Sequence, residues 1–497
     1  MQRSKICLCL TCPTIKEDLE VVEKYRNWID MVELRVDFLT KDGRLHIRKF
    51  PSLAKIPTIL TIRRKTDGGV FIEGEASRTT LFARGLAYAD QDIRKNFAFI
   101  DLEEDFQVPS LQDAAFAFGT RVIRSFHDMK GPVYNLGDRL ASMCITGYEI
   151  PKIACLPQNL SDVTRMFKET ENIDFEHIVC GMGDFGLSTR ILACKMNSFL
   201  TYVSPTETIE NMATIGHIDP ITINEVYNFK AIDKSTTLYG ITGYPLKATS
   251  SPAIHNGGYR KFGINAVYIP IKSETVEEAV TFAEQLDMKG LSVTVPHKEG
   301  ILRELDSIST EVGEIGACNT ILKTPKGWVG YNTDARGLKQ ALLEFLGCTK
   351  LGRRKVAIIG AGGAAKAAAY VIHELRGRCC IFNRTVSKAR DLADRYNFKY
   401  ASLGIESQEI LEEYSDIIIQ TTSIGMGSSG PYNEKDDPLS FYTFRGEEFV
   451  YDIIYYPEKT PMLERAESVG CNVCNGYSML KYQAYEQFSL FTGVKYE

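Results

Sequence analysis

Two lysines in this sequence lie among residues that could form a reactive or binding site, and the first is suited to chemistry on a ketone. The first, Lys152, lies in the apolar segment Ile-Pro-Lys-Ile-Ala at residues 150–154. A charged ammonium is costly to bury there, so we expect a lowered pKa for Lys152, which frees the amine to form an imine with a ketone. His127 follows Ser125-Phe126, and a histidine can carry the protons that this chemistry moves near neutral pH.

The second lysine, Lys298, lies in Val-Thr-Val-Pro-His-Lys-Glu at residues 293–299, and Asp334 ends the triplet Asn-Thr-Asp. This lysine and this aspartate lie in loops that also carry hydroxyl and amide groups. Hydroxyl and amide side chains in the surrounding loops suit a ligand with several hydroxyls and a carboxylate. The candidates of this kind are Thr249, Ser251, Thr294 and Asn319.

A glycine-rich turn, Gly-Ala-Gly-Gly-Ala-Ala at residues 360–365, follows the apolar run 356–359 and precedes an alanine-rich segment. A turn of this kind between a strand and a helix brings backbone amides to the pyrophosphate of a dinucleotide. The next apolar run, 379–382, ends in Asn383-Arg384-Thr385. An arginine at this place can pair with a 2′-phosphate, so we predict NADP(H) and not NAD as the cofactor.

The elements that must position the first lysine alternate between short β-branched runs and helical stretches. Eight such runs before residue 228 predict a (β/α)₈ TIM barrel, whose functional residues gather at the carboxyl ends of the strands. Glu33, Arg35, Arg63, His127 and Lys152 fall at such ends. The predicted strands are Ile6–Leu10, Met31–Arg35, Thr58–Ile62, Phe97–Asp101, Thr120–Ser125, Tyr148–Ala154, His177–Cys180 and Phe199–Tyr202.

The remaining chain predicts a second α/β region that includes a dinucleotide-binding unit. We expect the barrel to span residues 1–228 and a polar linker to span 229–237. A substrate-binding domain at 238–340 is followed by a Rossmann-type NADP-binding domain at 341–475. Residues 476–497 are expected to form a helix that returns to the substrate domain.

The bulk composition excludes several classes of partner. The 497 residues carry a formal net charge of -5, which does not favour nucleic acid or an anionic membrane. No apolar run reaches the roughly 18–20 residues that a membrane-spanning helix needs. The 13 cysteines are scattered, without the spacing of a metal site, and are typical of free thiols in a reducing compartment. We therefore expect a cytoplasmic protein with small-molecule substrates and no metal.

Region 238–497 resembles shikimate dehydrogenase. The motifs of that family occur in order along the chain and include the glycine-rich turn and Asn383-Arg384-Thr385. The others are the serine loop before Ser251-Pro252, V-T-V-P-x-K (293–298), A-x-N-T (317–320), N-T-D (332–334), T-S-x-G-M (422–426), D-x-x-Y-x-P (452–457) and M-L-x-x-Q-A (479–484).

This resemblance implies that Lys298 and Asp334 form a catalytic pair that passes a proton to the substrate oxygen while NADPH delivers hydride. Thr249, where the family usually has serine, and Ser251 would bind the carboxylate. Thr294, Asn319, Gln483 and Tyr455 would contact the rest of the substrate. The implied cofactor-binding residues are Gly360, Ala361, Gly362, Gly363, Ala364, Asn383, Arg384, Thr385, Thr422 and Gly476.

Region 1–228 resembles type I 3-dehydroquinate dehydratase. The matching stretches are E-L-R-V-D (33–37), R-x-x-x-D-G-G (63–69), S-F-H-D (125–128), P-K-I-A (151–154) and the helix that leads to Arg190. The resemblance implies an imine on Lys152 and proton transfer by His127. Asp67 stands where the family usually has glutamate, and residues 205–208 replace its usual A-P-G-Q loop. The implied substrate contacts are Glu33, Arg35, Arg63, Asp67, Arg190, Ser204 and Thr208.

Together the two resemblances predict a bifunctional enzyme, because the product of the first reaction, 3-dehydroshikimate, is the substrate of the second. One alternative is a fusion whose dehydrogenase oxidises quinate or shikimate catabolically. Another is a regulator that senses quinate on the same folds without catalysis. Lys152, His127, Lys298 and Asp334 are all present, which favours catalysis, and a preference for NADP favours biosynthesis.

Overall fold

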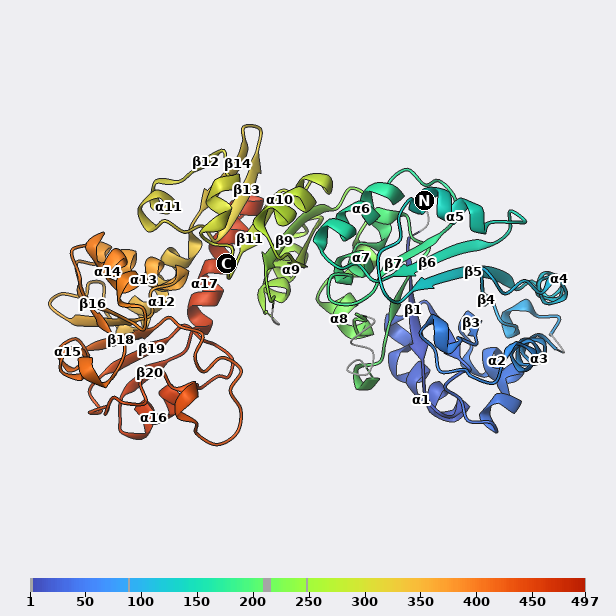
Figure 1. Ribbon diagram of the computed structural model, residues 1–497, viewed down its shortest axis with the longest axis horizontal. Coiled ribbons are helices and arrows are strands. Elements are labelled where there is room, and N and C mark those ends of the chain that lie inside the picture. The colour runs from blue at the N-terminus through green and yellow to red at the C-terminus, as the bar shows by residue number, and fades with distance from the viewer. Residues whose placement is uncertain (1–2, 88–89, 209–215, 247–248, 497) are drawn as a thin grey trace. The chain divides into compact units, whose positions relative to one another are not determined.

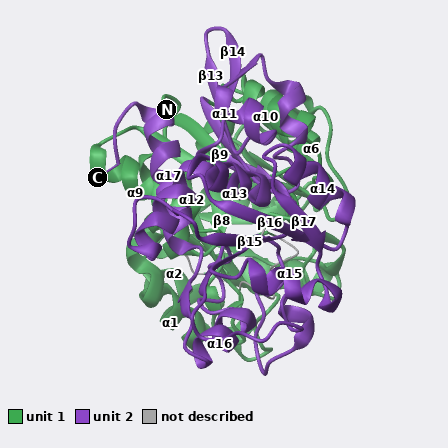
Figure 2. Ribbon diagram, turned by 90° about the vertical axis from the view of Figure 1, so that its left-hand side faces the viewer, with its two compact units in different colours: residues 1–240, 244–288 green, residues 241–243, 289–497 purple. Residues whose placement is uncertain are grey.

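The computed structural model describes residues 3–87, 90–208, 216–246 and 249–496. The chain forms two compact units (Figure 2). The first unit comprises residues 1–240 and 244–288, and the second comprises residues 241–243 and 289–497. The site residues predicted from the sequence all lie within the described ranges. Among the described residues, no helix is long and apolar enough to cross a membrane.

Eight parallel strands in the first unit form the predicted barrel (Figure 1). Neighbouring strands pair in chain order, and β8 pairs with β1. Phe199 N donates to His177 O at 2.7 Å, which joins the start of β8 to the start of β7 and closes the sheet. The strands are β1 Lys5–Leu10, β2 Met31–Arg35, β3 Thr58–Thr61, β4 Phe99–Glu103, β5 Arg121–Asp128, β6 Ile150–Cys155, β7 Ile178–Gly181 and β8 Leu200–Val203.

The interior of the barrel changes from apolar to charged along the strands. Alternate residues of a barrel strand face inward. Ile59, Phe99 and Ile150 belong to one buried apolar cluster in the barrel. Two residues further along β4 and β6, Asp101 and Lys152 follow on the same face. The period-2 pattern therefore places the charged groups above an apolar floor, at the carboxyl ends of the strands.

Helices connect the barrel strands, and the first unit continues beyond the barrel. The barrel helices are α1 Ile15–Tyr25, α2 Phe50–Ala54, α3 Glu75–Leu86, α4 Pro109–Ala117, α5 Leu136–Met143, α6 Leu160–Thr170, α7 Leu187–Ile191 and α8 Pro220–Glu225. The rest of this unit contains most of β9 Thr237–Gly243, together with α9 Ser251–Phe262, β10 Ala266–Lys272 and α10 Val276–Gln285.

A small sheet opens the second unit. Its strands run in the order β11, β13, β14, β12. Thr294 N donates to Thr242 O at 2.9 Å, so the end of β9 lies next to the end of β11 in this unit. The elements are β11 Gly290–Val293, β12 Ser307–Ile308, α11 Thr310–Ile315, β13 Thr320–Thr324, β14 Gly327–Tyr331 and α12 Thr333–Leu346.

The remainder of the second unit is a parallel six-stranded sheet in the order β17-β16-β15-β18-β19-β20. This is the 3-2-1-4-5-6 order of a dinucleotide-binding sheet, which binds its ligand where the order reverses, between β15 and β18. The strands are β15 Lys355–Ile359, β16 Arg378–Asn383, β17 Lys399–Ser402, β18 Ile417–Gln420, β19 Phe449–Asp452 and β20 Asn472–Cys474.

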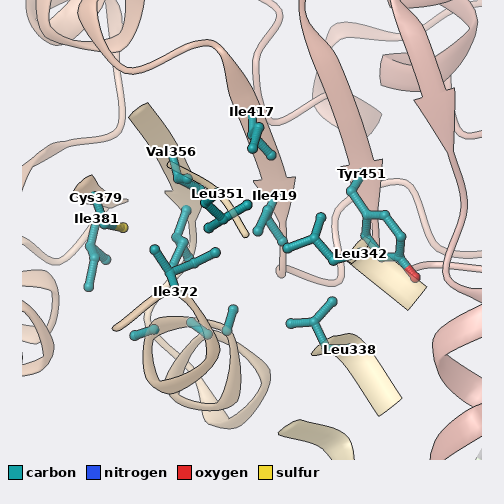
Figure 3. Close-up of a cluster of buried hydrophobic side chains, with 14 of the residues drawn as sticks. Leu338, Leu342, Leu351, Val356, Ile372, Cys379, Ile381, Ile417, Ile419 and Tyr451 are labelled. Carbon is teal, nitrogen blue, oxygen red and sulfur yellow. The ribbon is translucent and has the colours of Figure 1, made fainter. Parts of the chain in front are cut away.

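Apolar side chains from strands and helices fill the core below this sheet (Figure 3). Val356 of β15, Ile381 of β16 and Ile419 of β18 pack with Leu338 and Leu342 of α12. The last helix, α17, also packs against α12. The helices of this part are α13 Gly363–Glu374, α14 Val386–Asp394, α15 Gln408–Glu413, α16 Pro461–Ser468 and α17 Tyr477–Thr492.

Candidate active sites

The barrel site centres on Lys152, whose side chain on β6 is buried. Its Nζ donates to Asp101 Oδ2 at 2.9 Å and lies 4.0 Å from Glu33 Oε1. The same ammonium lies 4.4 Å from the centre of the Tyr202 ring. The pocket around Lys152 is lined by residues from the carboxyl ends of several strands. Seven predicted residues meet there: Glu33, Arg35, Arg63, Asp67, His127, Lys152 and Arg190.

The predicted fall in the pKa of Lys152 is wrong. Burial acts to lower this pKa, but the carboxylates of Asp101 and Glu33 outweigh it, so the pKa of Lys152 is raised. The amine is therefore an ammonium in the resting protein. It must lose a proton before it can attack a carbonyl.

Asp101 was not among the predicted site residues. It accepts hydrogen bonds from Lys152 and Ser125 and pairs with Arg63 at 2.9 Å. Burial acts to raise the pKa of Asp101, but Arg63 and Lys152 lower it overall, so this carboxyl stays ionised. Its signal in the sequence is the segment Ile-Asp-Leu-Glu at residues 100–103, where acidic residues alternate with apolar ones in a barrel strand.

His127 on β5 lies in the same pocket. Burial lowers its pKa well below the usual range, and the nearby cations Arg63 and Lys152 lower it further. Its Nδ1 is buried without a hydrogen-bond partner among the described residues. A neutral imidazole beside the reacting lysine can accept a proton, as the predicted role requires.

Three arginines make the pocket suitable for an anion. Arg190, on α7, is fully buried. Arg35 is held by Asp37 through two hydrogen bonds of 3.0 and 2.8 Å. Arg63 pairs with Glu103 at 2.8 Å as well as with Asp101. These pairs fix the guanidinium groups of Arg35 and Arg63 before a substrate binds.

His217 also lines the pocket, and the sequence analysis missed it. Ser204, a predicted contact, is hydrogen-bonded to His217 Nδ1. Gly216 has φ +69°, and a Cβ at this position would lie 2.3 Å from Gly183 O. The backbone at Gly216 therefore passes tightly against Gly183 in the loop after β7. This close approach turns the next residue, His217, toward the pocket. Thr208 does not line the pocket, and its hydroxyl donates to Pro205 O at 3.2 Å.

The second site lies in the second unit and joins Lys298 to Asp334. Lys298 Nζ donates to Asp334 Oδ2 at 2.5 Å, and Asn319 Nδ2 donates to Asp334 Oδ1 at 2.9 Å. Thr333 links this group to Gln483 of α17, whose Oε1 lies 3.4 Å from the threonine hydroxyl. The structure thus brings four predicted residues, Lys298, Asn319, Asp334 and Gln483, into one hydrogen-bonded group.

Local structure explains this arrangement. Asn332 caps α12 by accepting a hydrogen bond from Ala335 N, so Asp334 lies in the first turn of that helix. Cys318 N donates to Lys298 O at 2.8 Å, which fixes the loop that carries the lysine. Thr294 begins the same loop directly after β11.

Three further predicted substrate residues are described by their own local surroundings. Thr249 Oγ1 donates to Ser251 Oγ at 3.1 Å at the start of α9, in the first unit. Tyr455, in the second unit, is half-buried and follows β19. The proposed contacts of these three side chains with a substrate stay predictions.

The glycine-rich turn fits a dinucleotide pyrophosphate. Gly360 has φ +113°, and a Cβ there would lie 2.6 Å from Thr421 Oγ1, so only glycine suits the turn. No atom lies within 4 Å of the place where a Cβ of Gly362 would be, which leaves room for a phosphate. α13 begins at Gly363, and Ala361 and Ala364 lie in the turn and the first turn of the helix. The backbone amides at the start of α13 can bind the phosphates.

The remaining cofactor candidates lie at the ends of neighbouring strands. Asn383 Nδ2 donates to Thr385 O at 2.9 Å, which shapes the turn after β16, and Arg384 is exposed there. Thr422 follows β18, and its hydroxyl accepts from Ile424 N at 3.2 Å. A Cβ at Gly476 would lie 1.9 Å from Ile453 O, so the close approach of these two segments requires glycine at position 476.

Among the described residues, no group of His, Cys, Asp and Glu could hold a metal ion.

Fold and sites together define a (β/α)₈ barrel with an internal lysine, joined to a Rossmann-type dinucleotide-binding enzyme. Three family models match in order: type I 3-dehydroquinase over residues 6–234, shikimate dehydrogenase substrate binding domain over 241–321, and shikimate/quinate 5-dehydrogenase over 344–426. The chain belongs to the family of bifunctional 3-dehydroquinate dehydratase/shikimate dehydrogenases.

The family assignment rests on a relative that matches almost the whole chain. The chloroplastic bifunctional 3-dehydroquinate dehydratase/shikimate dehydrogenase of Arabidopsis thaliana is 30% identical over 99% of this chain and 82% of its own length. The NADP(+) shikimate dehydrogenase of Thermococcus kodakarensis is 38% identical over 53% of this chain and 93% of its own. The solved dehydroquinate dehydratase and shikimate dehydrogenase from S. pombe is 24% identical, covers 100% of this chain and 96% of its own, and has a TM-score of 0.43.

Proposed function

We propose that the protein catalyses two consecutive steps of the shikimate pathway. The barrel dehydrates 3-dehydroquinate to 3-dehydroshikimate, and the dehydrogenase half reduces that product to shikimate with NADPH. The observation that carries this proposal is the buried Lys152, held by Asp101 in a pocket with His127 and three arginines. The Arabidopsis relative, whose name states both activities, supports it.

In the barrel, the Lys152 amine adds to the ketone carbon of the substrate, and the carbonyl oxygen leaves as water to give an imine. His127 removes a proton from the adjacent carbon, because its lowered pKa keeps it neutral and able to accept one. The hydroxyl on the next carbon leaves as water with a proton returned by His127. Addition of water to the imine then releases the product and restores the Lys152 amine.

The arginines orient the substrate in the barrel pocket. The substrate is a carboxylate, and we assign Arg190 as its main partner, with Arg35 and Arg63 nearby. A carboxylate bound at one end of the ring places the ketone at the other, next to Lys152. The second carboxylate around the lysine, Glu33, accepts a hydrogen bond from Thr61 at 2.7 Å and is thus fixed in place.

In the dehydrogenase half, Lys298 donates a proton to the ketone oxygen, and Asp334 holds its ammonium in place. Asn319 and Gln483, on the same hydrogen-bonded group, would bind ring hydroxyls. NADPH, when bound at the glycine-rich turn, supplies the hydride. Arg384 would hold its 2′-phosphate, which is the reason that the cofactor is NADP(H) and not NAD.

The two alternatives have less support. A sensor without catalysis has no need for both the Lys152–Asp101 and the Lys298–Asp334 pairs. A catabolic dehydrogenase would use the same fold, and Arg384 at the end of β16 favours the biosynthetic direction. A location in the cytoplasm remains a prediction, and the Arabidopsis relative is named chloroplastic.

Reduction with borohydride tests the imine. When the protein is treated with borohydride in the presence of 3-dehydroquinate, we expect a covalent adduct on Lys152, found by mass spectrometry of peptides. The Lys152→Ala variant should lose dehydration, by at least about 10³-fold, since a covalent route is removed.

The same variant supplies the control, because its dehydrogenase half is unchanged. It should still oxidise shikimate with NADP at the wild-type rate. Modification of other lysines only, with Lys152 unmodified during turnover, would refute the imine mechanism. Loss of both activities in Lys152→Ala would refute the assignment of the two reactions to separate sites.

A further inference from the structure

Two charged residues without a role in the chemistry above form an ion pair beside the catalytic lysine of the dehydrogenase half. Lys366 Nζ lies 2.8 Å from Glu299 Oε1. Glu299 directly follows Lys298 in the loop after β11, and Lys366 lies in the second unit on α13, the helix that begins at the glycine-rich turn. The ion pair thus connects the loop that carries the proton donor to the helix that faces the cofactor phosphates.

A second contact joins the same two elements. A Cβ added to Gly363, the first residue of α13, would lie 3.3 Å from Lys298 Cδ and 3.7 Å from Lys298 Cβ. The hydrocarbon stem of Lys298 therefore lies close against the start of α13. The catalytic loop touches this helix twice, once through Lys298 and once through Glu299.

The other contacts of Lys298 come from different elements. Cys318, directly before β13, holds its backbone oxygen, and Asp334 of α12 holds its ammonium. Cys318 lies outside the nucleotide-binding sheet, whereas α12 packs against that sheet through Leu338 and Leu342. The Glu299–Lys366 pair is a direct charged link between the loop of the proton donor and α13, the helix that begins at the glycine-rich turn. The Lys366 side chain is 14% exposed and the Glu299 side chain is 57% exposed, so water reaches the pair mainly from the glutamate side and screens it in part.

We propose that Glu299 and Lys366 are positioning residues of the dehydrogenase reaction, which fix the Lys298 loop to α13 so that proton donor and cofactor face the substrate together. This inference rests on the proposed reduction of 3-dehydroshikimate. A flexible lysine reaches the right place only if its loop is held, and a shift of about 1 Å can cost up to about 100-fold in rate. The ion pair lowers the freedom of the loop without touching substrate.

Lys366 has a rival role, since a cation near the start of a helix can also bind a cofactor phosphate. The two roles predict different kinetics. A phosphate ligand strengthens cofactor binding and does not need Glu299. A positioning pair changes kcat, needs both partners, and leaves the affinity for the cofactor unchanged.

The experiment compares Lys366→Met, Glu299→Gln and the double variant in the oxidation of shikimate by NADP, with NADPH affinity measured separately by fluorescence titration. We expect each single variant to lower kcat by about 3- to 10-fold, with the Kd for NADPH unchanged within about 2-fold. The double variant should be no slower than the slower single variant, because both remove one interaction. The reversed pair Glu299→Lys/Lys366→Glu should recover most of kcat.

Lys339→Met is the matched control. It breaks another lysine–glutamate pair of α13, in which Lys339 Nζ lies 2.5 Å from Glu374 Oε1 at the far end of the helix. This variant should keep the wild-type kcat, and the NADPH titration, made on every variant, reports that the dehydrogenase half is folded. Equal losses in Lys339→Met and Lys366→Met would mean that the helix is merely destabilised, and would overturn the proposal.

Other outcomes overturn it as clearly. A weaker Kd for NADPH in Lys366→Met, with Glu299→Gln unaffected, would make Lys366 a phosphate ligand. Unchanged kcat in both single variants, or additive losses in the double variant without recovery on reversal, would also exclude a positioning pair. Wild-type protein that binds NADPH but does not oxidise shikimate would instead refute the proposed function, and the titrations distinguish that case.

Discussion

Asp101 keeps the resting Lys152 amine protonated, and this carboxylate therefore sets the pH range in which the imine can form. The pKa of Lys152 is raised because Asp101 and Glu33 outweigh the opposing effect of burial. In Asp101→Asn, burial should prevail and lower that pKa. The rate of borohydride trapping with 3-dehydroquinate depends on free amine, so its acidic limb should move to lower pH by about one unit or more.

Trapping rates measured from about pH 5 to 9 test this prediction. Glu176→Gln is a suitable control, because Glu176 pairs with Arg121 on the exposed part of the barrel and does not line the Lys152 pocket. An acidic limb that stays in place in Asp101→Asn, with adduct still formed on Lys152, would mean that another group controls the amine.

His217 is a second residue whose substitution should affect dehydration alone. Its imidazole lines the pocket and is hydrogen-bonded to Ser204. Burial lowers its pKa well below the usual range, and Arg190 lowers it further, so it meets the substrate as a neutral group. His217→Ala should raise KM for 3-dehydroquinate by about 5-fold, the value of one neutral hydrogen bond.

The control for His217→Ala is His46→Ala, which changes an exposed histidine of the same barrel. Steady-state kinetics of both reactions are compared, and shikimate oxidation should stay at the wild-type level in both variants. An unchanged KM for 3-dehydroquinate in His217→Ala would remove this residue from the substrate site.

These residues show what the sequence can and cannot predict at this scale. Lysines, arginines and His127 are recognisable because each has a chemical role and a motif around it. Asp101 lies 51 residues from Lys152 along the chain, so the apolar neighbours of Lys152 in the sequence indicated the wrong direction for its pKa. His217 has no motif around it, and its place in the pocket follows from the path of the backbone past Gly183.

At the scale of elements, α1 contains a buried carboxylate that couples the stability of the barrel to pH. Asp18, in the first part of α1, accepts a hydrogen bond from Cys12 N at 3.1 Å and so ties the helix to the end of β1. Burial raises its pKa to about 7, although the hydrogen bonds from Cys12 lower it somewhat. The folded state therefore holds this proton more tightly than the unfolded state does.

It follows that Asp18 costs stability as the pH rises from about 4 to about 7, because the unfolded chain releases its proton first. In Asp18→Asn this dependence should weaken. The melting temperature of the barrel should rise at pH 8 relative to wild type, by about 2–4 °C per kcal/mol, and should not change near pH 4. Calorimetry over this pH range tests it, with Glu20→Gln, a change at an exposed position of the same helix, as the control. Parallel pH curves for Asp18→Asn and wild type would contradict the prediction.

The strands were the most predictable elements. β2 has the predicted bounds, and β1 differs from them by one residue, because a run of β-branched and apolar residues between turns leaves few alternatives. β5 extends three residues beyond the predicted Ser125, to Asp128. Polar residues at the carboxyl end of a strand look like a loop in the sequence, yet in a barrel these are the residues that form the site.

At the scale of the whole molecule, the two sites are built from different sets of residues. The described residues that line the Lys152 pocket all lie in the first unit, while Lys298, Asp334, Asn319, Gln483 and the glycine-rich turn lie in the second. The domain bounds expected from the sequence stay a prediction, and Thr249 and Ser251 of the dehydrogenase motifs lie in the first unit. The catalytic residues of the two reactions are nevertheless separate sets. Each activity should therefore be removable without loss of the other.

A mixture of two single-site variants tests this independence. Lys152→Ala should retain reduction, and Lys298→Met should retain dehydration, so neither alone converts 3-dehydroquinate to shikimate. When mixed with NADPH, they should restore the conversion, since 3-dehydroshikimate released by one protein can bind the other. Cofactor oxidation should begin after a lag that shortens as more Lys152→Ala protein is added, because that protein consumes the free intermediate. If Lys298→Met loses dehydration, or Lys152→Ala loses reduction of added 3-dehydroshikimate although it still binds NADPH, the two sites do not act independently.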